Sequence, residues 1–164
     1  MFAASRLLKT VMLSCLVLVL SSCGFHLKRA SDLPSDLMIM EVTATDTNSA
    51  LYAQLINELE ISNVQVNDNL RANSPTLTLV SDSLDRRALS LFKNGQVAEY
   101  ELIYSVSYTL ERAGDKPVEQ YFELYRNYQD DPDNALAKAN EMNILLQELR
   151  KQASRRIVRE LAQL

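Results

Sequence analysis

Cysteine is scarce in this sequence of 164 residues, and so are histidine and glycine. The two cysteines are Cys15 and Cys23, and the first lies inside an apolar N-terminal stretch that we expect to be removed. A mature chain that keeps only Cys23 cannot form an internal disulfide or a cysteine metal site. The scarcity of cysteine therefore excludes a disulfide scaffold and thiol chemistry.

The single histidine, His26, lies near the start of the expected mature chain, so no Ser-His-Asp set can form in the main part of the domain. No second histidine is present to share a metal with it. The three glycines are scattered, which excludes a phosphate-cradling loop. Glu99 and Glu101 fall on a strand face that we expect to be solvated, where charge is ordinary. We therefore expect no catalytic residue, no metal and no cofactor, and a binding or structural protein instead of an enzyme.

The first 22 residues have the pattern of a secretory signal peptide. Two cations precede an apolar run, 11–20, that is much shorter than the roughly 20 residues of a membrane-spanning helix. The run ends in Leu20-Ser21-Ser22-Cys23, which resembles a lipobox, where the cysteine is acylated and becomes the new N-terminus. The alternative is an ordinary signal peptide with a chance cysteine. Gly24, where an aspartate would signal retention, favours the outer membrane by resemblance to enterobacterial sorting rules.

Cleavage after residue 22 would leave 142 residues, the size of one domain. The signal removes Arg6 and Lys9, which leaves 15 basic against 21 acidic residues and a net charge of −6. An acidic domain of this kind is a poor nucleic-acid binder. We divide the chain into a signal peptide, 1–22, a lipidated tether, 23–36, and a single domain, 37–164.

The first half of the domain predicts one strand and one helix. The short apolar run 37–42 indicates a buried strand. A helix follows from an N-cap at Asp46 or Thr47 to about Glu60, because apolar residues recur at helical spacing. Residues 64–66 form a possible short extended piece.

The stretch 76–111 predicts a long β-hairpin. Apolar residues alternate on both sides of Asn94-Gly95, a dipeptide that suits the positive φ angles of a type I′ turn. The first strand's period slips at Leu84, which indicates a bulge. On the return strand, even-numbered residues from Ala98 to Leu110 share the buried face.

A third strand, 118–128, and a C-terminal helix complete the prediction. Asp131-Pro132 has the pattern of a helix start, with proline at the first helical position. The helix then carries one apolar stripe from Met142 to Leu161. The order β-α-β-β-β-α predicts an α+β two-layer sandwich, in which two helices pack on a four-stranded mixed sheet.

Three short motifs follow one another along the chain: Cys23-Gly24-Phe25-His26-Leu27-Lys28 with Leu33-Pro34, Leu91-Phe92-Lys93-Asn94-Gly95-Gln96-Val97-Ala98-Glu99-Tyr100, and Asn134-Ala135-Leu136-Ala137-Lys138-Ala139-Asn140-Glu141. In this order and spacing they resemble the LptE family (also called RlpB) of lipopolysaccharide-assembly lipoproteins, over essentially the whole mature chain. Lys93 stands where an arginine is also found in relatives, which keeps the charge but not the bidentate geometry. The chain also lacks the polar tail of some relatives.

The resemblance implies a protein that plugs the lumen of the outer-membrane β-barrel LptD, helps that barrel fold, and binds lipopolysaccharide on its way to the cell surface. The expected partners are LptD, lipopolysaccharide and the lipid of the outer membrane. The expected location is the periplasmic side of that membrane, held by acyl chains, and the barrel lumen.

For lipopolysaccharide binding, the resemblance implies Phe92, Lys93 and Lys138, with Arg126 as a weaker candidate. Phe92, Asn94 and Gly95 at the hairpin tip are the expected contacts with the partner. A cation beside an apolar side chain matches a ligand with phosphates on an acyl-chain body, and lysine binds phosphate as a point charge. The alternative is that Lys93 is a soluble turn residue and Lys138 a solvated helix charge.

Two rival functions remain open. An accessory lipoprotein of another envelope machine, such as the barrel-insertion complex or a lipid transporter, would share the anchor and the lack of catalysis but not the hairpin-tip motif. An envelope enzyme is disfavoured by the residues available for catalysis.

Overall fold

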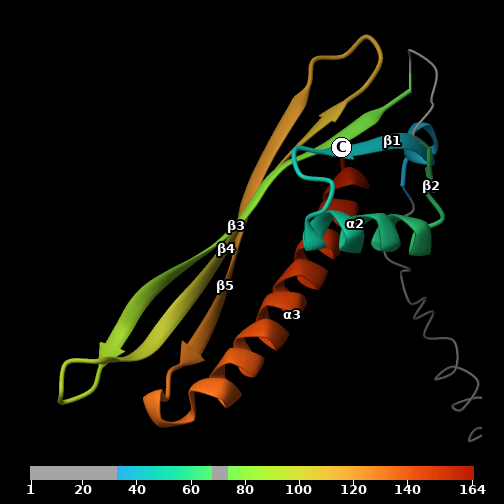
Figure 1. Ribbon diagram of the computed structural model, residues 1–164. Helices are drawn as coiled ribbons and strands as arrows, with labels where there is room; N and C mark the ends of the chain where they lie inside the picture. The colour runs from blue at the N-terminus through green and yellow to red at the C-terminus, as the bar shows by residue number, and fades with distance from the viewer. Residues whose placement is uncertain (1–32, 68–73) are drawn as a thin grey trace, which may run out of the picture.

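A computed structural model describes residues 33–67 and 74–164 of the chain. The expected signal peptide 1–22, Cys23 with His26, and most of the tether lie outside these residues. The described part is elongated, with a long twisted sheet and two helices packed against it (Figure 1). This is the α+β sandwich that the sequence predicts.

Three long antiparallel strands make up most of the sheet. They are β3 (Thr76–Leu91), β4 (Val97–Glu111) and β5 (Val118–Gln129). On the other side of β3 lies β1 (Ile39–Ala44), which pairs parallel to β3, and next to it the short β2 (Gln65–Val66). The strand order is β2-β1-β3-β4-β5, so the prediction of a mixed sheet is confirmed.

The sheet has five strands, where the sequence predicts four. The additional strand is β2, part of the extended piece expected at 64–66. Its backbone bonds to β1 are regular: the Gln65 N–H donates to the Met38 carbonyl at 2.8 Å, and the Asn67 N–H donates to the Met40 carbonyl at 3.2 Å. β2 has only two residues, and a strand this short has no hydrophobic alternation from which the sequence could predict it.

Helix α2 (Ala50–Ile61) begins later than predicted. Its N-cap is Ser49, whose Oγ accepts a hydrogen bond from the Tyr52 N–H at 3.1 Å. Asp46 instead accepts from the Asn48 N–H at 2.9 Å and holds the preceding turn. The proposed caps at Asp46 and Thr47 are therefore wrong, because an aspartate suits a turn as well as a cap.

The β3–β4 hairpin forms as predicted, but its turn is not type I′. The Gly95 N–H donates to the Phe92 carbonyl at 2.9 Å, and the Phe92 N–H donates to the Gln96 carbonyl at 2.8 Å. Gly95 has a φ of +84°, whereas Asn94 is not among the described residues with positive φ. This is the pattern of a type I turn followed by a left-handed glycine, which sequence alone does not separate from the two-residue type.

The predicted bulge in β3 is present, but at a different residue. The register with β4 shifts between Leu79 and Ser81, so Val80 is the unpaired residue, and it shifts again near Leu89. After the first bulge Leu84 lies opposite Tyr104 on the buried face. The slip in hydrophobic period was therefore a correct signal, four residues late.

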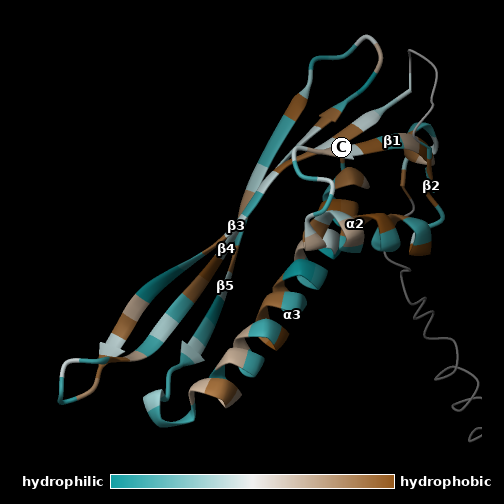
Figure 2. Cartoon of the chain, viewed as in Figure 1, coloured by the Kyte–Doolittle hydropathy of each residue, from teal (hydrophilic) through white to brown (hydrophobic). Residues whose placement is uncertain are grey.

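The buried core lies between the sheet and the two helices, towards the end that holds β1 and α2. Along β4, buried residues alternate with partly exposed ones from Leu102 to Leu110, and the buried ones are apolar or aromatic. Figure 2 shows hydrophobic and hydrophilic bands along the strands. The largest fully buried side chains are Leu37, Met40, Leu51, Leu55, Leu59, Leu77, Leu102, Tyr104, Tyr108, Leu110, Leu149 and Ile157. At roughly 1.5–3 kcal/mol for each fully buried large apolar side chain, this cluster is the main source of stability.

Asp131 caps a short 3-10 turn, Pro132–Asn134, and α3 (Ala135–Leu161) follows it. The predicted helix start at Asp131-Pro132 is therefore confirmed as the start of this turn. All fully buried residues of α3 lie at Leu149 or beyond. We call the end with the β3–β4 turn and the first turns of α3 the distal end.

Two polar clusters fasten the sheet to α3 and to itself. The Glu160 carboxylate accepts from the Tyr108 hydroxyl at 2.7 Å and from Arg156 Nε at 2.7 Å. The Tyr104 hydroxyl donates to Asp82 Oδ2 at 2.6 Å. Burial, and then the neighbouring carboxylate, raises the pKa of both tyrosines well above the ordinary value. Arg156 of α3 is thus part of the contact between the helix and the sheet.

Candidate functional site

A cavity of about 550 Å³ opens at the distal end, where the hairpin tip, the end of β5 and the start of α3 come together. It is lined by Ser90, Phe92, Ala98, Glu99, Gln129, Asp130, Asp131 and Lys138. A neighbouring cavity of about 340 Å³ shares Lys138 and adds Tyr128 and Glu141. Lys138 therefore lies between the two cavities.

Each carboxylate that lines the larger cavity already has a donor. Glu99 accepts from the Ser90 hydroxyl at 2.8 Å and from the Gln129 amide at 3.4 Å. Asp130 accepts from the Asp131 N–H at 3.0 Å. Glu99 is thus part of the hydrogen bonding between the strands of the hairpin and β5.

Asp131 holds the start of the helical segment. Its side chain accepts from the Asp133 N–H at 3.1 Å and from the Asn134 amide at 2.6 Å. These two bonds, the one from Asn134 first, lower the pKa of Asp131 below its usual range. The carboxylate is therefore charged at neutral pH, and Asp131 and Lys138 both line the larger cavity.

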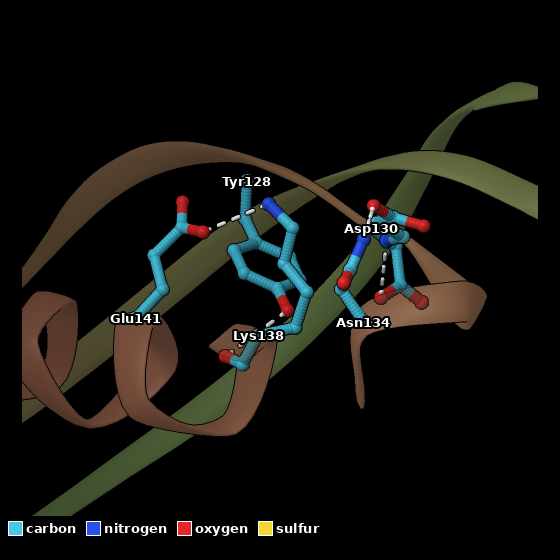
Figure 3. Close-up of polar contacts among 6 residues, drawn as sticks. Tyr128, Asp130, Asn134, Lys138 and Glu141 are labelled. Atoms are coloured by element: carbon cyan, nitrogen blue, oxygen red, sulfur yellow. Dashed lines mark hydrogen bonds and ion pairs between the residues drawn. The ribbon is translucent and has the colours of Figure 1, made fainter. Parts of the chain in front are cut away.

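Lys138 has a defined position between an aromatic ring and a carboxylate. Its Nζ lies 2.8 Å from Glu141 Oε2 and 5.2 Å from the centroid of the Tyr128 ring (Figure 3). The Tyr128 hydroxyl in turn donates to the Lys138 carbonyl at 3.3 Å. The hydrogen bond to Glu141, opposed by partial burial, raises the pKa of Lys138. The ammonium is therefore charged at every physiological pH.

Lys138 also stands at an unusual place for a cation. It lies in the first turn of α3, which holds no acidic residue, and the helix dipole disfavours positive charge there. Residues that break such a local rule are often functional. The same dipole favours an anion that approaches the first turn.

The structure brings two of the predicted ligand-binding residues together. Phe92, which is 42% exposed, and Lys138 line the same cavity although 46 positions separate them in sequence. Lys93 is exposed on the turn and is not among the residues that line the cavity. Asn94 binds its own loop: its side chain accepts from the Gln96 N–H at 3.1 Å and donates to the Gln96 side chain at 2.9 Å.

The arginines lie elsewhere on the sheet. Arg126 pairs with the buried Leu102 and therefore lies on the sheet face turned towards α3. Tyr128, two residues further along β5, lies on the same face. Arg86 shares that face and its guanidinium lies 5.8 Å from the Tyr100 ring centroid. Arg126 is not among the residues that line the distal cavity, so a ligand would have to extend beyond it to reach this side chain.

Sequence reasoning missed the immediate partners of Lys138. Glu141 carried a usable signal, because residues three apart on a helix are neighbours. Tyr128 carried none, since its contact with Lys138 depends on how β5 packs against α3. The acidic lining from Glu99, Asp130 and Asp131 was missed for the same reason, and it makes the surroundings of Lys138 more negative than the motif suggests.

The sheet face that looks away from the helices is hydroxyl-rich and acidic. Tyr121 and Tyr125 are 62% and 50% exposed, and both hydroxyls donate to Glu123, which lies between them on β5. These two bonds lower the pKa of Glu123. Arg87 forms an ion pair with Glu101 on the same face. Hydroxyl and charged groups on this sheet face could form hydrogen bonds with a polar partner surface.

Within residues 33–67 and 74–164, no helix is long and apolar enough to cross a membrane. Over the same residues, no group of three or more histidine, cysteine or acidic side chains is placed to hold a metal ion. The arrangement at Lys138 offers recognition of an anion beside an apolar group.

A comparison with protein families matches residues 38–161 to the model described as "LptE: Lipopolysaccharide-assembly". The chain is also similar to two proteins named LPS-assembly lipoprotein LptE. The one from Photorhabdus laumondii is 32% identical over 152 residues, which is 93% of this chain and 84% of that protein. The one from Yersinia pestis is 32% identical over 153 residues, covering 93% and 74%.

Solved structures have the same fold. The rare lipoprotein B from Shewanella oneidensis superposes with a TM-score of 0.71 at 38% identity, over 76% of this chain and 94% of that one. A minor lipoprotein from Acinetobacter baumannii reaches a TM-score of 0.62 at 16% identity, over 77% and 91%. The second likeness concerns the fold alone.

Proposed function

Because the chain belongs to the LptE family of lipopolysaccharide-assembly lipoproteins, we propose that it is anchored to the outer membrane through an acylated Cys23, plugs and helps assemble the LptD β-barrel, and binds lipopolysaccharide in transit. The family is one of assembly lipoproteins and not of enzymes. The proposal adds to family membership a partner, a ligand and the residues that contact each.

The observation that carries the ligand is the shared cavity of Phe92 and Lys138. The two motifs that suggested a ligand site lie on different elements, yet the fold places both beside one opening. A charged ammonium next to an exposed phenyl ring suits a phosphate attached to an apolar body. Lys93, exposed on the adjoining turn, adds a second cation within reach of a large ligand.

The observation that supports the barrel is the shape and polarity of the sheet. The long hairpin projects beyond the packed core (Figure 1), and the face turned away from the helices is rich in hydroxyl and carboxylate groups. Lumens of large outer-membrane barrels are polar or plugged. A slender domain with a polar face therefore suits such a lumen, with Phe92, Asn94 and Gly95 at its leading tip.

The ligand site is tested by charge reversal in the full-length lipidated protein. Lys93→Asp and Lys138→Asp should each weaken binding of purified lipopolysaccharide by roughly tenfold, because a hydrogen bond to a charged group contributes about 1.5–3 kcal/mol. Lys116→Asp, on the exposed turn between β4 and β5, is the matched control and should bind normally. If neither Lys93→Asp nor Lys138→Asp changed lipopolysaccharide binding, these lysines would not belong to the ligand site.

The partner is tested by purification from membranes. The detergent-solubilised protein should recover one large β-barrel in fixed stoichiometry, and the Lys93→Asp and Lys138→Asp variants should still recover it. Recovery of a different envelope machine in place of that barrel would contradict the proposed partner while leaving family membership in place.

A further inference from the structure

Lys138 is not a free cation waiting for a ligand, because Glu141 already occupies it. The two charged groups are 2.8 Å apart, and Lys138 has only 19% of its side chain exposed. Any phosphate that binds the Lys138 ammonium must share it with, or take it from, the Glu141 carboxylate.

The ion pair between Lys138 and Glu141 can be broken without disturbing other contacts of Glu141. Its side chain is 47% exposed, and within the described part of the chain its hydrogen-bond and ion-pair partner is Lys138. The pair also has the less favourable order on a helix, with lysine N-terminal to glutamate. The Tyr128 ring, whose centroid lies 5.2 Å from Lys138 Nζ, gives the ammonium a second contact that does not depend on Glu141.

The remaining carboxylates cannot take over this role. Asp131 is held by Asp133 and Asn134, and Glu99 is held by Ser90 and Gln129. Asp130 accepts from the Asp131 backbone. These three groups keep the surroundings negative, whereas Glu141 is the one carboxylate of residues 33–67 and 74–164 that forms an ion pair with the ammonium.

We propose that Glu141 is an intramolecular competitor for Lys138, which lowers the affinity of the site for a phosphate group so that the ligand is passed on instead of retained. This inference rests on the proposed ligand site at Lys138. A tethered carboxylate is present at high effective concentration, so it reduces the affinity of every anion without contacting the ligand itself. Glu141 is thus a residue that sets affinity through Lys138.

The test is a double-mutant cycle on the full-length protein with two probes, purified lipopolysaccharide and inorganic phosphate. Glu141→Gln should raise the affinity for both by roughly two- to fivefold, the range expected from an exposed ion pair. In a Lys138→Met background the same change should have no effect, because the competitor then has nothing to compete for. Glu148→Gln, an exposed glutamate on the same helix, is the matched control and should leave binding unchanged in both backgrounds.

The outcomes separate the inference from the function. A gain that persists in the Lys138→Met background would mean that Glu141 acts as a general negative charge, which overturns the inference. No gain from Glu141→Gln, with weaker lipopolysaccharide binding in Lys138→Met, would overturn it too while the ligand site stands. Lipopolysaccharide binding that is indifferent to Lys138→Met would refute the ligand site. If Glu141→Gln raised the affinity for phosphate but not for lipopolysaccharide, Glu141 would still compete for Lys138. That result would refute lipopolysaccharide as the ligand of the site.

Discussion

Single residues join the sheet to α3 at a few polar points, and the Glu160 carboxylate is the clearest of them. It holds the Tyr108 hydroxyl and the Arg156 guanidinium together, and that guanidinium also lies 4.2 Å from the Phe122 ring centroid. Tyr108 is buried, whereas the Arg156 and Glu160 side chains are 36% and 28% exposed. The buried Tyr108 hydroxyl therefore depends on Glu160 for its hydrogen bond, because a buried donor without a partner is costly.

Tyr108 gives this cluster a pH dependence. Burial, reinforced by Glu160, raises its pKa, so the fold keeps the phenol neutral. The unfolded tyrosine ionises near pH 10, so the stabilisation is complete below that value and is lost as pH rises above it. We expect urea unfolding to show a stability that falls between about pH 10 and 11.

Tyr108→Phe should make that fall shallower while lowering stability at pH 7 by about 1–2 kcal/mol, because Glu160 loses a donor. The matched control is Tyr121→Phe on the exposed sheet face. Its free energy of unfolding should depend on pH in the same way as that of the wild-type protein. An equally steep fall in Tyr108→Phe would exclude this hydroxyl as the titrating group.

Among the elements, those with long periodic patterns followed from sequence and those that depend on a few atoms did not. The alternation along 97–111 and the apolar stripe of the last helix carry many residues, so β4 and α3 form as predicted. The cap at Ser49, the bulge at Val80 and the turn type at Gly95 each depend on local hydrogen bonds. At the site, Phe92 and Lys138 followed from motifs, whereas Tyr128 required the packing of β5 against α3.

The hairpin turn offers a direct test at this scale. Gly95 has a φ of +84°, and a Cβ placed there meets nothing within 4 Å. Gly95→Ala should therefore cost about 1–2 kcal/mol of unfolding free energy through backbone strain alone. Gly95→Asn should cost less, because asparagine tolerates this conformation. Urea unfolding of the two variants measures both values, and equal losses would argue against strain as the cause.

The whole molecule divides into a packed half and a slender half. Buried side chains of α2, β1 and the second half of α3 enclose one cluster, whereas no residue of α3 before Leu149 is fully buried. Regions with few buried apolar contacts open at lower free energy than the core. The distal end that carries the proposed ligand site is thus the less rigid part.

Native-state hydrogen exchange should reveal that gradient. We expect amides of β4 near Tyr108 and of α3 beyond Leu149 to exchange most slowly, and amides near the Gly95 turn and in the first turns of α3 to exchange much faster. Mass spectrometry of proteolytic fragments resolves these segments. Uniform protection along the hairpin would show that the distal half is as stable as the core.

The brief pairing between β1 and β3 has a consequence for self-association. β1 covers β3 only from Thr76 to Leu79, and no strand of the described residues pairs with that side of β3 from Ser81 onwards. An open strand edge invites other chains to add to it. Bulges at Val80 and near Leu89, with charged Asp85 between them, are the devices that discourage such addition. We therefore expect these features to limit the addition of other chains to the open edge of β3.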